Sequence, residues 1–273
     1  MFMKHRLTAL FAALMLCITL ATQTLAVELP IVIANGEAIQ MDAPVSVIQQ
    51  TTYVSYWPIV KTFYPDATAT WENDRAVVRA EGLHMEIQPG AIYMVANGRY
   101  LYIPEGVLVD NGILTVPVRT LGQALGLNVE WDASAGAVVL TESGSGPIKD
   151  GSLVYQADVV HWLSRIINAE SGNQPLLGQV AVGSVIRNRV ASPIFPNTVY
   201  EVIHQTNQFT PVRNGSINKT PDEDAVIAAK LALEGVKPVG DSLYFINPKV
   251  SGRSWVARNR THVATIAAHA FYK

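Results

Sequence analysis

Cysteine, histidine and charge are all scarce in this chain of 273 residues. The single cysteine, Cys17, lies in an apolar run that begins at Leu7 and ends near Ala21. Because no other thiol follows it, we expect neither a disulfide framework nor thiol chemistry in the remaining chain. Charged residues make up 15% of the sequence, and the formal net charge is −2. Since the basic residues form no cluster, the sequence does not indicate nucleic acid as a partner.

The first residues have the pattern of a secretory signal peptide. Two basic residues precede the apolar run, and Thr24 and Ala26 are the small residues of a cleavage site. The run is too short for a comfortable transmembrane helix, and Leu16 before Cys17 does not fit a lipoprotein signal. We therefore expect residues 1–26 to be a signal peptide and the protein to be secreted.

Composition changes near residue 150, which predicts two domains. Residues 27–150 contain 14 acidic and 6 basic residues, a net charge of −8. Residues 151–273 contain 8 acidic and 12 basic residues, a net charge of +4, which suits an anionic polymer such as a cell-wall glycan. A Ser-Gly-Ser-Gly-Pro stretch separates the two parts and is typical of a flexible linker. We expect a first domain at 27–142, a linker at 143–150 and a second domain at 151–273.

The first half contains an internal repeat with an offset of about 60–62 residues. The recurring pairs are Ala34–Gly36 with Ala96–Gly98, Thr52–Ser55 with Leu114–Pro117, Trp71–Asp74 with Trp131–Ser134, and Ala76–Val78 with Ala137–Val139. Each unit predicts strands, an Asn-Gly turn and one short helix, at 119–127 in the second unit, so we expect a β-rich α+β module. The second unit resembles the copper amine oxidase N-terminal-like domain of secreted Gram-positive proteins. One histidine, His84, is too few for copper, so we expect a binding or spacer module with a wall or protein partner.

Glu170 is the candidate catalytic residue of the second half. Residues 157–171 predict a helix, because Leu163, Ile166 and Ile167 recur at helical spacing. Glu170 falls on the same apolar stripe, in the last turn before a Gly-Asn stop signal. Partial burial and the negative end of the helix dipole both raise the pKa of a carboxyl group, as a general acid requires. The alternative is a frayed helix end that leaves Glu170 in water.

The rest of the second half predicts a mainly helical domain with a small β element. We expect helices over 177–190, from a capping box at 220–223 to residue 234, and over 261–272, with a short strand over 242–246. Amides and aromatic rings in the loops suit hydrogen bonds to hydroxyl and acetamido groups and stacking on sugar rings. The candidate substrate-binding residues are Gln179, Gln208, Phe209, Tyr244, Asn247 and Trp255. For each aromatic ring, ordinary core packing is the alternative.

Ten short motifs follow one another along the second half. They are Ile167–Gly172, Gly178–Val182, Asn188–Val190, Phe195-Pro196, Val202-Ile203, Gln208–Val212, Ala228-Ala229, Tyr244-Phe245, Asn247-Pro248 and His269–Phe271. Together they resemble the SleB-type family of spore cortex-lytic cell-wall hydrolases over residues 157–273. The resemblance implies an α-rich fold related to lytic transglycosylases and goose-type lysozyme, with one catalytic glutamate that falls on Glu170. It also implies peptidoglycan glycan strands as the substrate and a location in the cell wall or the spore envelope.

The number of carboxylates separates two mechanisms. A muramidase-type hydrolase needs a second carboxylate, as nucleophile or as base for water. Asp222, Glu223 and Asp224 lie in a capped first turn, and Glu201 lies near a predicted helix start, so each has a structural explanation. A lytic transglycosylase needs only one. We therefore favour cleavage between N-acetylmuramic acid and N-acetylglucosamine that leaves a 1,6-anhydro product.

Two further functions stay open as alternatives. A zinc amidase would need two histidines and a carboxylate at ligand spacing, but His161, His204, His262 and His269 are scattered, so we predict no metal and no other cofactor. A non-catalytic wall-binding protein could keep the same fold, although the intact surroundings of Glu170 argue against it. The favoured prediction is a secreted peptidoglycan-degrading enzyme. Action on spore cortex during germination is its narrower form, and action on the vegetative wall is the alternative.

Overall fold

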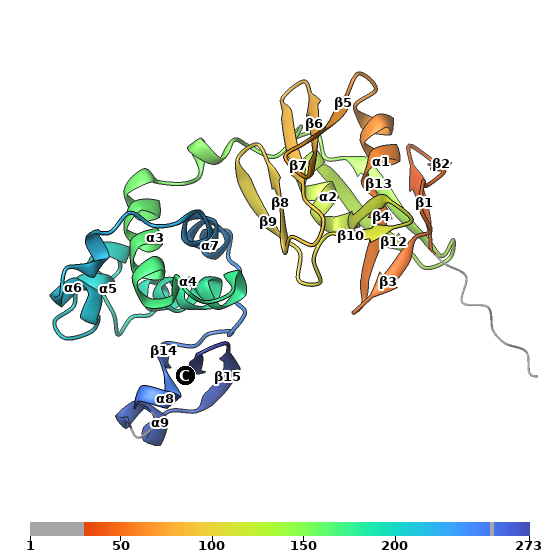
Figure 1. Cartoon of the computed structure of the whole chain (residues 1–273). Coiled ribbons are helices and arrows are strands. Elements are labelled where there is room, and N and C mark those ends of the chain that lie inside the picture. The colour runs from red at the N-terminus through yellow and green to blue at the C-terminus, as the bar shows by residue number, and fades with distance from the viewer. Residues whose placement is uncertain (1–29, 252–253) are drawn as a thin grey trace, which may run out of the picture.

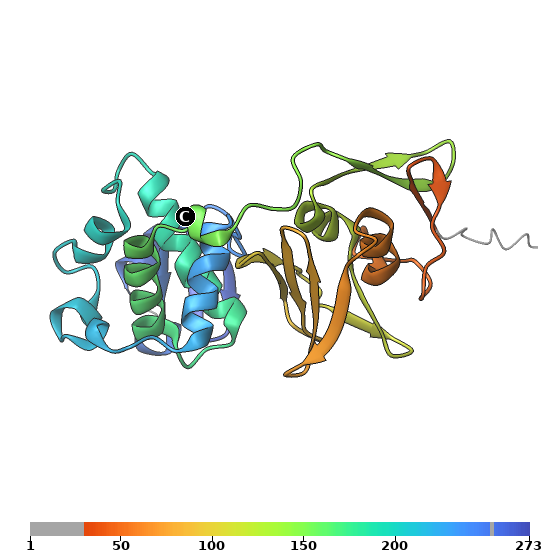
Figure 2. The same ribbon diagram turned by 90° about the horizontal axis from the view of Figure 1, so that it is seen from above.

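The computed structural model describes residues 30–251 and 254–273. The predicted signal peptide, 1–26, and Cys17 lie outside these residues. Two modules lie side by side in Figures 1 and 2, a β-rich module from β1 to β13 and a mainly helical module that follows it. The predicted fold class is therefore confirmed. None of the helices in the described ranges is long and apolar enough to cross a membrane.

Strands and two short helices form the β-rich module. Its elements are β1 (Ile31–Ala34), β2 (Glu37–Ala38), β3 (Ser46–Ile48), β4 (Thr51–Ser55), α1 (Tyr56–Phe63), β5 (Thr68–Glu72), β6 (Arg75–Ala80), β7 (Leu83–Ile87), β8 (Tyr93–Ala96), β9 (Arg99–Tyr102), β10 (Leu108–Asp110), β11 (Ile113–Pro117), α2 (Val118–Leu125), β12 (Leu127–Asp132) and β13 (Ala137–Glu142). The same order of elements occurs twice, first from β1 to β6 and then from β8 to β13, with β7 between the two units. This order confirms the internal repeat.

The two units of the repeat meet around a pseudo-twofold axis. β4 pairs with β11 antiparallel, with Val54 opposite Val116, and these two valines occupy the same position of the repeat. Strands from both units also share the other sheets, because β1 pairs in parallel with β13 and β7 joins β6 to β8. Since each sheet takes strands from both units, the two units form one hydrophobic core.

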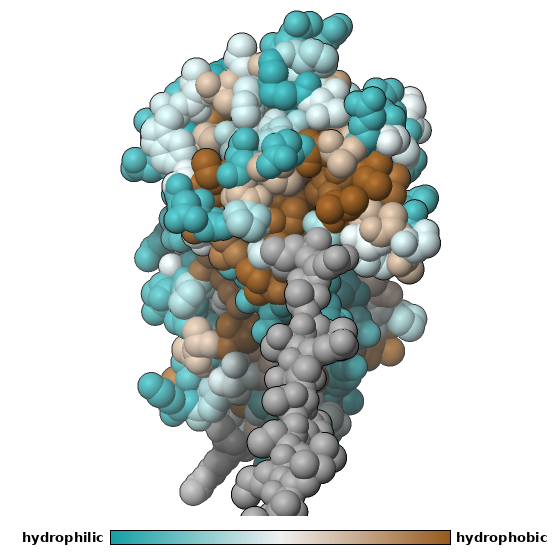
Figure 3. All heavy atoms as spheres, turned by 90° about the vertical axis from the view of Figure 1, so that its right-hand side faces the viewer, coloured by the Kyte–Doolittle hydropathy of each residue, from teal (hydrophilic) through white to brown (hydrophobic). Residues whose placement is uncertain are grey.

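One end of the β-rich module, at β1 and β2, has an apolar surface. Figure 3 views this end and shows a brown patch of apolar residues. Ile31 is 49% exposed, and Ile39 and Met41 line a groove of about 560 Å³ that also includes Ile31. Polar side chains therefore cover this module unevenly.

The mainly helical module packs three helices around a second core. Its elements are η1 (Gly151–Leu153), α3 (Ala157–Ser171), α4 (Leu176–Ala191), α5 (Val199–His204), α6 (Thr210–Arg213), η2 (Ser216–Asn218), α7 (Glu223–Leu233), β14 (Tyr244–Ile246), α8 (Pro248–Ser251), α9 (Trp255–Asn259), β15 (His262–Ile266) and β16 (His269–Tyr272). α3 has the predicted bounds. A Cβ added to Gly183 of α4 would lie 2.8 Å from Ile167 Cδ1 of α3 and 3.0 Å from Ala232 Cβ of α7. The glycine therefore allows the three helices to approach closely.

The predicted helix over 261–272 is wrong. This segment forms an antiparallel hairpin of β15 and β16, and β16 also pairs with β14. β-branched side chains at Val263, Thr265 and Ile266 favour a strand, and every residue of β16 is buried. His262 and His269 therefore do not share a helix face. Pairing with the distant strand β14 decides the structure, which the local helix-like pattern could not reveal.

The predicted start of α7 is displaced by two residues. Asp222, rather than Thr220, caps the helix, and its carboxylate accepts a hydrogen bond from the Ala225 backbone N–H at 2.8 Å. Pro221 therefore lies before the helix and not at its first position. An Asp at the N-cap serves the same purpose as the Thr that was expected there.

The segment 143–150, predicted to be a flexible linker, runs along the β-rich module. Ile148 is 9% exposed and belongs to the core of that module. The Asn97 side chain donates a hydrogen bond to the Ile148 carbonyl oxygen at 2.8 Å. A Cβ added to Gly126 would lie 1.7 Å from the Gly146 carbonyl oxygen, so the chain passes very close to the end of α2. These contacts hold the segment even though its Ser-Gly composition favours flexibility.

The two modules contact each other through β9 and α7. The Arg99 guanidinium donates from Nε to a carboxylate oxygen of Glu234 at 2.8 Å, and the Tyr155 hydroxyl donates to the same oxygen. Lys230 Nζ lies 4.8 Å from the centre of the Tyr100 ring. The Glu234 side chain is only 8% exposed. Because a buried ion pair tolerates little change in geometry, these contacts orient one module on the other.

Candidate active site

Glu170 lies in the last turn of α3, on the side of the helix that faces the core. Leu163, Ile166 and Ile167 on this side are fully buried, and Glu170 is half-buried at its end. The helix ends at Ser171, before the predicted stop at Gly172. The sequence pattern thus predicted both the helix and the position of the carboxylate. The Glu170 side chain is therefore partly buried against the core and partly accessible to water.

A pocket of about 490 Å³ opens beside Glu170. Its walls come from the C-terminal ends of α3 and α4, the segment around α6, β14 with α8, and the start of β16. The lining residues are Ala169, Glu170, Arg189, Gln208, Phe209, Thr210, Pro211, Asn214, Ser216, Phe245, Ile246, Asn247, Val250, Ser251 and His269. Glu170 is the only carboxylate among the described residues that line it. The remaining amides, hydroxyls and aromatic rings suit a sugar chain.

Burial raises the pKa of Glu170 to about 6. The main cause is the loss of hydration, which disfavours the charged carboxylate, and the nearby Arg189 cation lowers the pKa by a smaller amount. No hydrogen bond from the described residues stabilises the carboxylate. At mildly acidic pH a large fraction of the molecules therefore keeps this proton, as general acid catalysis requires.

Arg189 is a buried cation in the wall of the same pocket. Its Nε donates to the Leu243 carbonyl oxygen at 2.8 Å, and its Nη1 donates to the Gln208 side-chain oxygen at 3.3 Å. The guanidinium carbon lies 4.9 Å from the ring centre of Phe195 and 5.4 Å from that of Phe209. Burial lowers the pKa of Arg189 to about 10, so the side chain stays charged at neutral pH. The cation is therefore held by hydrogen bonds and aromatic faces, beside Glu170.

The predicted substrate-binding residues divide into two groups. Gln208, Phe209 and Asn247 line the pocket with Glu170. The other three lie outside it: Gln179 is buried within α4, Tyr244 lies on β14, and Trp255 is in α9 and 54% exposed. Gln179 donates from Nε2 to the Gln174 carbonyl oxygen at 3.1 Å. The Tyr244 and Trp255 rings both face Arg260, whose guanidinium carbon lies 4.7 Å and 4.9 Å from their centres.

Sequence reasoning missed two buried polar residues of the pocket, Arg189 and His269. His269 is 7% exposed, and its Nδ1 has no hydrogen-bond partner among the described residues. Burial lowers the pKa of His269, so the ring is neutral at neutral pH. Both residues occur in the short motifs of the second half, and this was the one feature of the sequence that could have indicated a role in the site. Their distance along the chain from Glu170 concealed that they share its pocket.

Two of the other candidate carboxylates, Glu201 and Asp222, have structural roles. Thr198 caps α5: its hydroxyl accepts from the Glu201 backbone N–H at 3.2 Å and donates to the Glu201 carboxylate at 2.8 Å. Asp222 caps α7, as described above. Neither carboxylate lines the pocket of Glu170. Across the described ranges, the structure contains no cluster of three or more His, Cys, Asp or Glu side chains that could hold a metal ion.

Two family models match separate parts of the chain. Residues 173–272 match the Cell Wall Hydrolase family, and residues 25–140 match the copper amine oxidase N-terminal domain family. The chain therefore combines a SleB-like cell wall hydrolase domain with an N-terminal copper amine oxidase N-terminal domain. Glu170 lies three residues before the start of the range that matches the Cell Wall Hydrolase family.

The second half is similar to several spore cortex-lytic enzymes. The one from Bacillus cereus is 40% identical over 119 residues, which is 44% of this chain and 46% of that protein. The one from Bacillus subtilis is 36% identical over 112 residues, 41% of this chain and 36% of that protein. The chain thus spans about half the length, or less, of these curated relatives. A solved catalytic domain of the germination-specific lytic transglycosylase SleB from Bacillus anthracis is 39% identical, with a TM-score of 0.41, over 44% of this chain and 97% of that domain.

Proposed function

We propose that this chain is a peptidoglycan lytic transglycosylase with Glu170 as its catalytic acid and base. It cleaves the glycan strand between N-acetylmuramic acid and N-acetylglucosamine. The observation that carries the proposal is a single half-buried carboxylate with a raised pKa, in a pocket of about 490 Å³ lined by amides and aromatic rings. Similarity of the second half to spore cortex-lytic enzymes supports the choice of polymer.

One group suffices for both proton transfers of this reaction. Protonated Glu170 donates its proton to the glycosidic oxygen, and the bond from that oxygen to C1 of muramic acid breaks. The C6 hydroxyl of the same sugar then forms a bond to C1 and returns its proton to Glu170. The products are a 1,6-anhydro sugar and a new glycan end, and no water is consumed. An internal hydroxyl needs no second carboxylate to position it.

The neighbours of Glu170 support its two protonation states. Burial favours the protonated acid before the reaction, and the Arg189 cation stabilises the carboxylate that remains after the proton has left. Arg189 also donates to the Gln208 side-chain oxygen, which leaves the Gln208 amide N–H groups for a substrate oxygen. Asn247 and Phe209 line the same pocket and offer a further amide and a ring face.

A hydrolase of the muramidase type is the second candidate. It would need another carboxylate within the pocket, whereas Glu201 accepts a hydrogen bond from the α5 cap Thr198 and Asp222 caps α7. A non-catalytic wall-binding protein is the third. It would use the same amides and rings but would have no need for the raised pKa of Glu170.

The test is digestion of purified spore cortex and of vegetative peptidoglycan by the secreted full chain. We expect muropeptides with anhydromuramic ends, which are lighter by one water than hydrolytic products and are separated by mass spectrometry. Glu170→Gln should lower the rate by about 10²–10⁴-fold, since the amide cannot donate the proton. Glu201→Gln, a carboxylate outside the pocket, is the matched control and should keep its activity.

Each outcome of this digestion selects one candidate function. Reducing ends alone would show that the enzyme is a hydrolase, and release of no product at all would favour a binding protein. Cleavage of cortex in preference to vegetative wall would assign the enzyme to the spore envelope and to germination. The opposite preference would assign it to the vegetative wall.

A further inference from the structure

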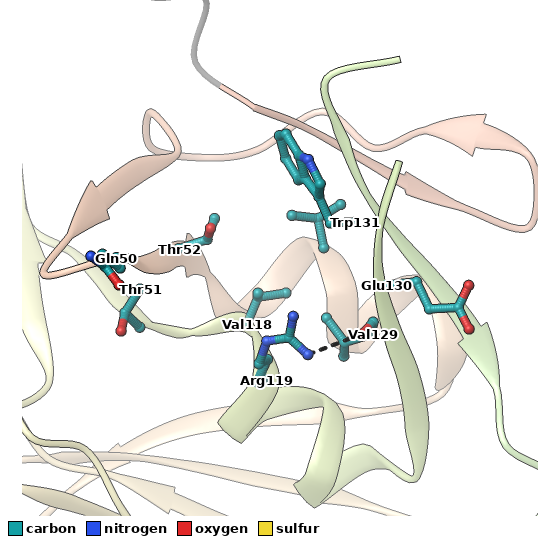
Figure 4. Close-up of a pocket in the computed structure, with 9 residues that line it drawn as sticks. Gln50, Thr51, Thr52, Val118, Arg119, Val129, Glu130 and Trp131 are labelled. Atoms are coloured by element: carbon teal, nitrogen blue, oxygen red, sulfur yellow. Dashed lines mark hydrogen bonds between the residues drawn. The ribbon is translucent and has the colours of Figure 1, made fainter. Parts of the chain in front are cut away.

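A second pocket, of about 240 Å³, lies in the β-rich module (Figure 4). Its walls come from the start of β4, the first turn of α2, β12 and β13. The lining residues are Gln50, Thr51, Thr52, Val118, Arg119, Val129, Glu130, Trp131 and Val138. The pocket therefore combines one large aromatic ring with hydroxyl, amide and guanidinium groups. It belongs to the module for which the proposed catalytic function offers no role.

Arg119 and Trp131 face the same space. In Figure 4 the Arg119 guanidinium points into the pocket below the Trp131 ring, and Glu130 points away from it. Arg119 donates from Nη1 to the Val129 carbonyl oxygen at 3.3 Å. It forms no ion pair with any described carboxylate, so the charge is free for an external anion. The Trp131 side chain is 54% exposed, which leaves a ring face open to a ligand.

The internal repeat provides a built-in comparison for this pocket. α1 and α2 begin directly after β4 and β11, so equivalent positions follow from the element bounds. Gln50, Thr51, Thr52 and Arg119 correspond to Gly112, Ile113, Leu114 and Trp57. Trp131 corresponds to Trp71, which is also exposed, at 60%. The four positions near Trp131 thus carry polar side chains. The four equivalent positions near Trp71 carry no polar side-chain group apart from the indole N–H of Trp57.

The turn beside the pocket shows the same difference. Gln49 and Gln50 connect β3 to β4 with φ of 48° and 62°, in the left-handed region that side chains other than Asn and Gly adopt at a cost. The equivalent turn in the second unit is Asn111-Gly112, with φ of 49° and 85°, which is the favoured sequence for this hairpin type. The first unit therefore has a strained turn where a relaxed one is available. The strained residue Gln50 is the one that lines the pocket, and strain of this kind gathers at binding sites.

We infer that this pocket is a second, non-catalytic sugar site that binds a hexose carrying a carboxylate, of the N-acetylmuramic acid class. The Trp131 face contacts the sugar ring, Arg119 binds the carboxylate, and Gln50, Thr51 and Thr52 bond to hydroxyl and acetamido groups. The choice of muramic acid rests on the proposed function, whereas the site itself rests on the geometry of the pocket. Because Arg99 and Glu234 join the modules, binding of a muramic acid residue without its stem peptide, whose lactyl carboxyl group is free, holds the catalytic module next to the insoluble polymer.

The first experiment measures binding by the full chain with Glu170→Gln, so that the polymer is not digested. Isothermal titration with N-acetylglucosaminyl-N-acetylmuramic acid should detect two sites, one in each module. Trp131→Ala and Arg119→Gln should each remove or weaken one of them by about tenfold or more. Trp71→Ala, the equivalent exposed tryptophan, is the matched control and should keep both. The same order should appear in sedimentation with insoluble glycan strands from which an amidase has removed the stem peptides, because only there are the lactyl carboxyl groups free.

Three outcomes would overturn the inference. Trp131→Ala and Arg119→Gln could bind like the parent while melting at the same temperature. Trp71→Ala could lose as much binding as Trp131→Ala, which would indicate a general aromatic surface. The uncharged N-acetylglucosamine dimer could bind this site as tightly as the muramic acid probe, which would remove the role of Arg119. Trp131→Phe guards against misfolding, because a ring retained there should preserve most of the affinity.

The second experiment separates this inference from the proposed function. In the chain with Glu170 intact, Trp131→Ala should cleave short soluble glycan at the parent rate, because the two pockets lie in different modules (Figure 1). If the chain cleaves glycan but Trp131→Ala does not weaken binding, only the second site is refuted. If Trp131→Ala weakens binding but the chain cleaves no glycan, only the catalytic proposal is refuted.

Discussion

Replacing Glu170 with Gln should stabilise the protein at neutral pH while it abolishes cleavage. The folded-state pKa of about 6 is higher than the ordinary value of 4.5, so the folded chain holds this proton more tightly than the unfolded chain. The stability that the proton contributes is fully present below about pH 4.5 and is lost as the pH rises through about 6. A pKa difference of about 1.5 corresponds to about 2 kcal/mol at pH 7.

Gln has nearly the same shape as Glu but carries no charge, so it avoids this loss. We therefore expect the stability of Glu170→Gln, relative to the parent, to rise by about 2 kcal/mol between about pH 4 and about pH 7. The change across pH matters more than the absolute value, since it does not depend on how well the amide packs. Urea unfolding of both proteins at a series of pH values, followed by circular dichroism, measures it.

The control for this experiment is Ser216→Ala, which changes an uncharged residue of the same pocket. Its stability relative to the parent should not depend on pH. A pH-independent difference for Glu170→Gln as well would refute the reasoning, because it would mean that burial does not perturb the carboxyl group. A stabilised but inactive Glu170→Gln variant would show that the buried carboxylate of Glu170 lowers the stability of the fold although the proposed reaction needs this group.

The remaining predictions concern the same pocket and the fold around it. Cleavage should fall about tenfold per unit above about pH 6, because only protonated Glu170 donates a proton, and a rate that is constant to about pH 8 would contradict the raised pKa. Arg189→Gln should move this limb of the pH profile to higher pH, since the guanidinium lowers the pKa of Glu170, and an unmoved limb would show that the two groups do not interact. Gly183→Ala should cost about 1–3 kcal/mol in urea unfolding, because its Cβ would meet Ile167, and unchanged stability would refute the close helix contact. Proteolysis within 143–150 should leave two folded halves, of which the second is active, and an insoluble second half would show that the modules fold only together.

Local patterns predicted the helix that carries Glu170. Leu163, Ile166 and Ile167 recur at the spacing of one helix face, and a carboxylate in register with them must lie near the core. Periodicity of this kind depends only on neighbours within a few turns, so it can be read without the fold. The internal repeat was readable for a similar reason, because a duplicated segment shows itself by comparison with its own copy.

Long-range pairing was not readable in the same way. β16 is a strand because it lies between β14 and β15, and β14 ends some twenty residues earlier in the chain. The segment 143–150 has the composition of a flexible linker, yet Ile148 packs into the core. In both cases a contact with a distant residue outweighs the local preference of the chain.

The sequence by itself determined that the chain has two modules, that the first is a β-rich duplication, and that Glu170 lies half-buried in the last turn of a helix. These properties follow from composition, from repetition within the chain and from the periodicity of apolar residues. All three can be read from the sequence without knowledge of the fold. Only the tertiary structure decided which side chains join Glu170, because Arg189, Phe245 and His269 come from separate elements that meet in one pocket. It also decided that Arg119 and Trp131 line one pocket, since a cavity exists only where packed elements leave space between them.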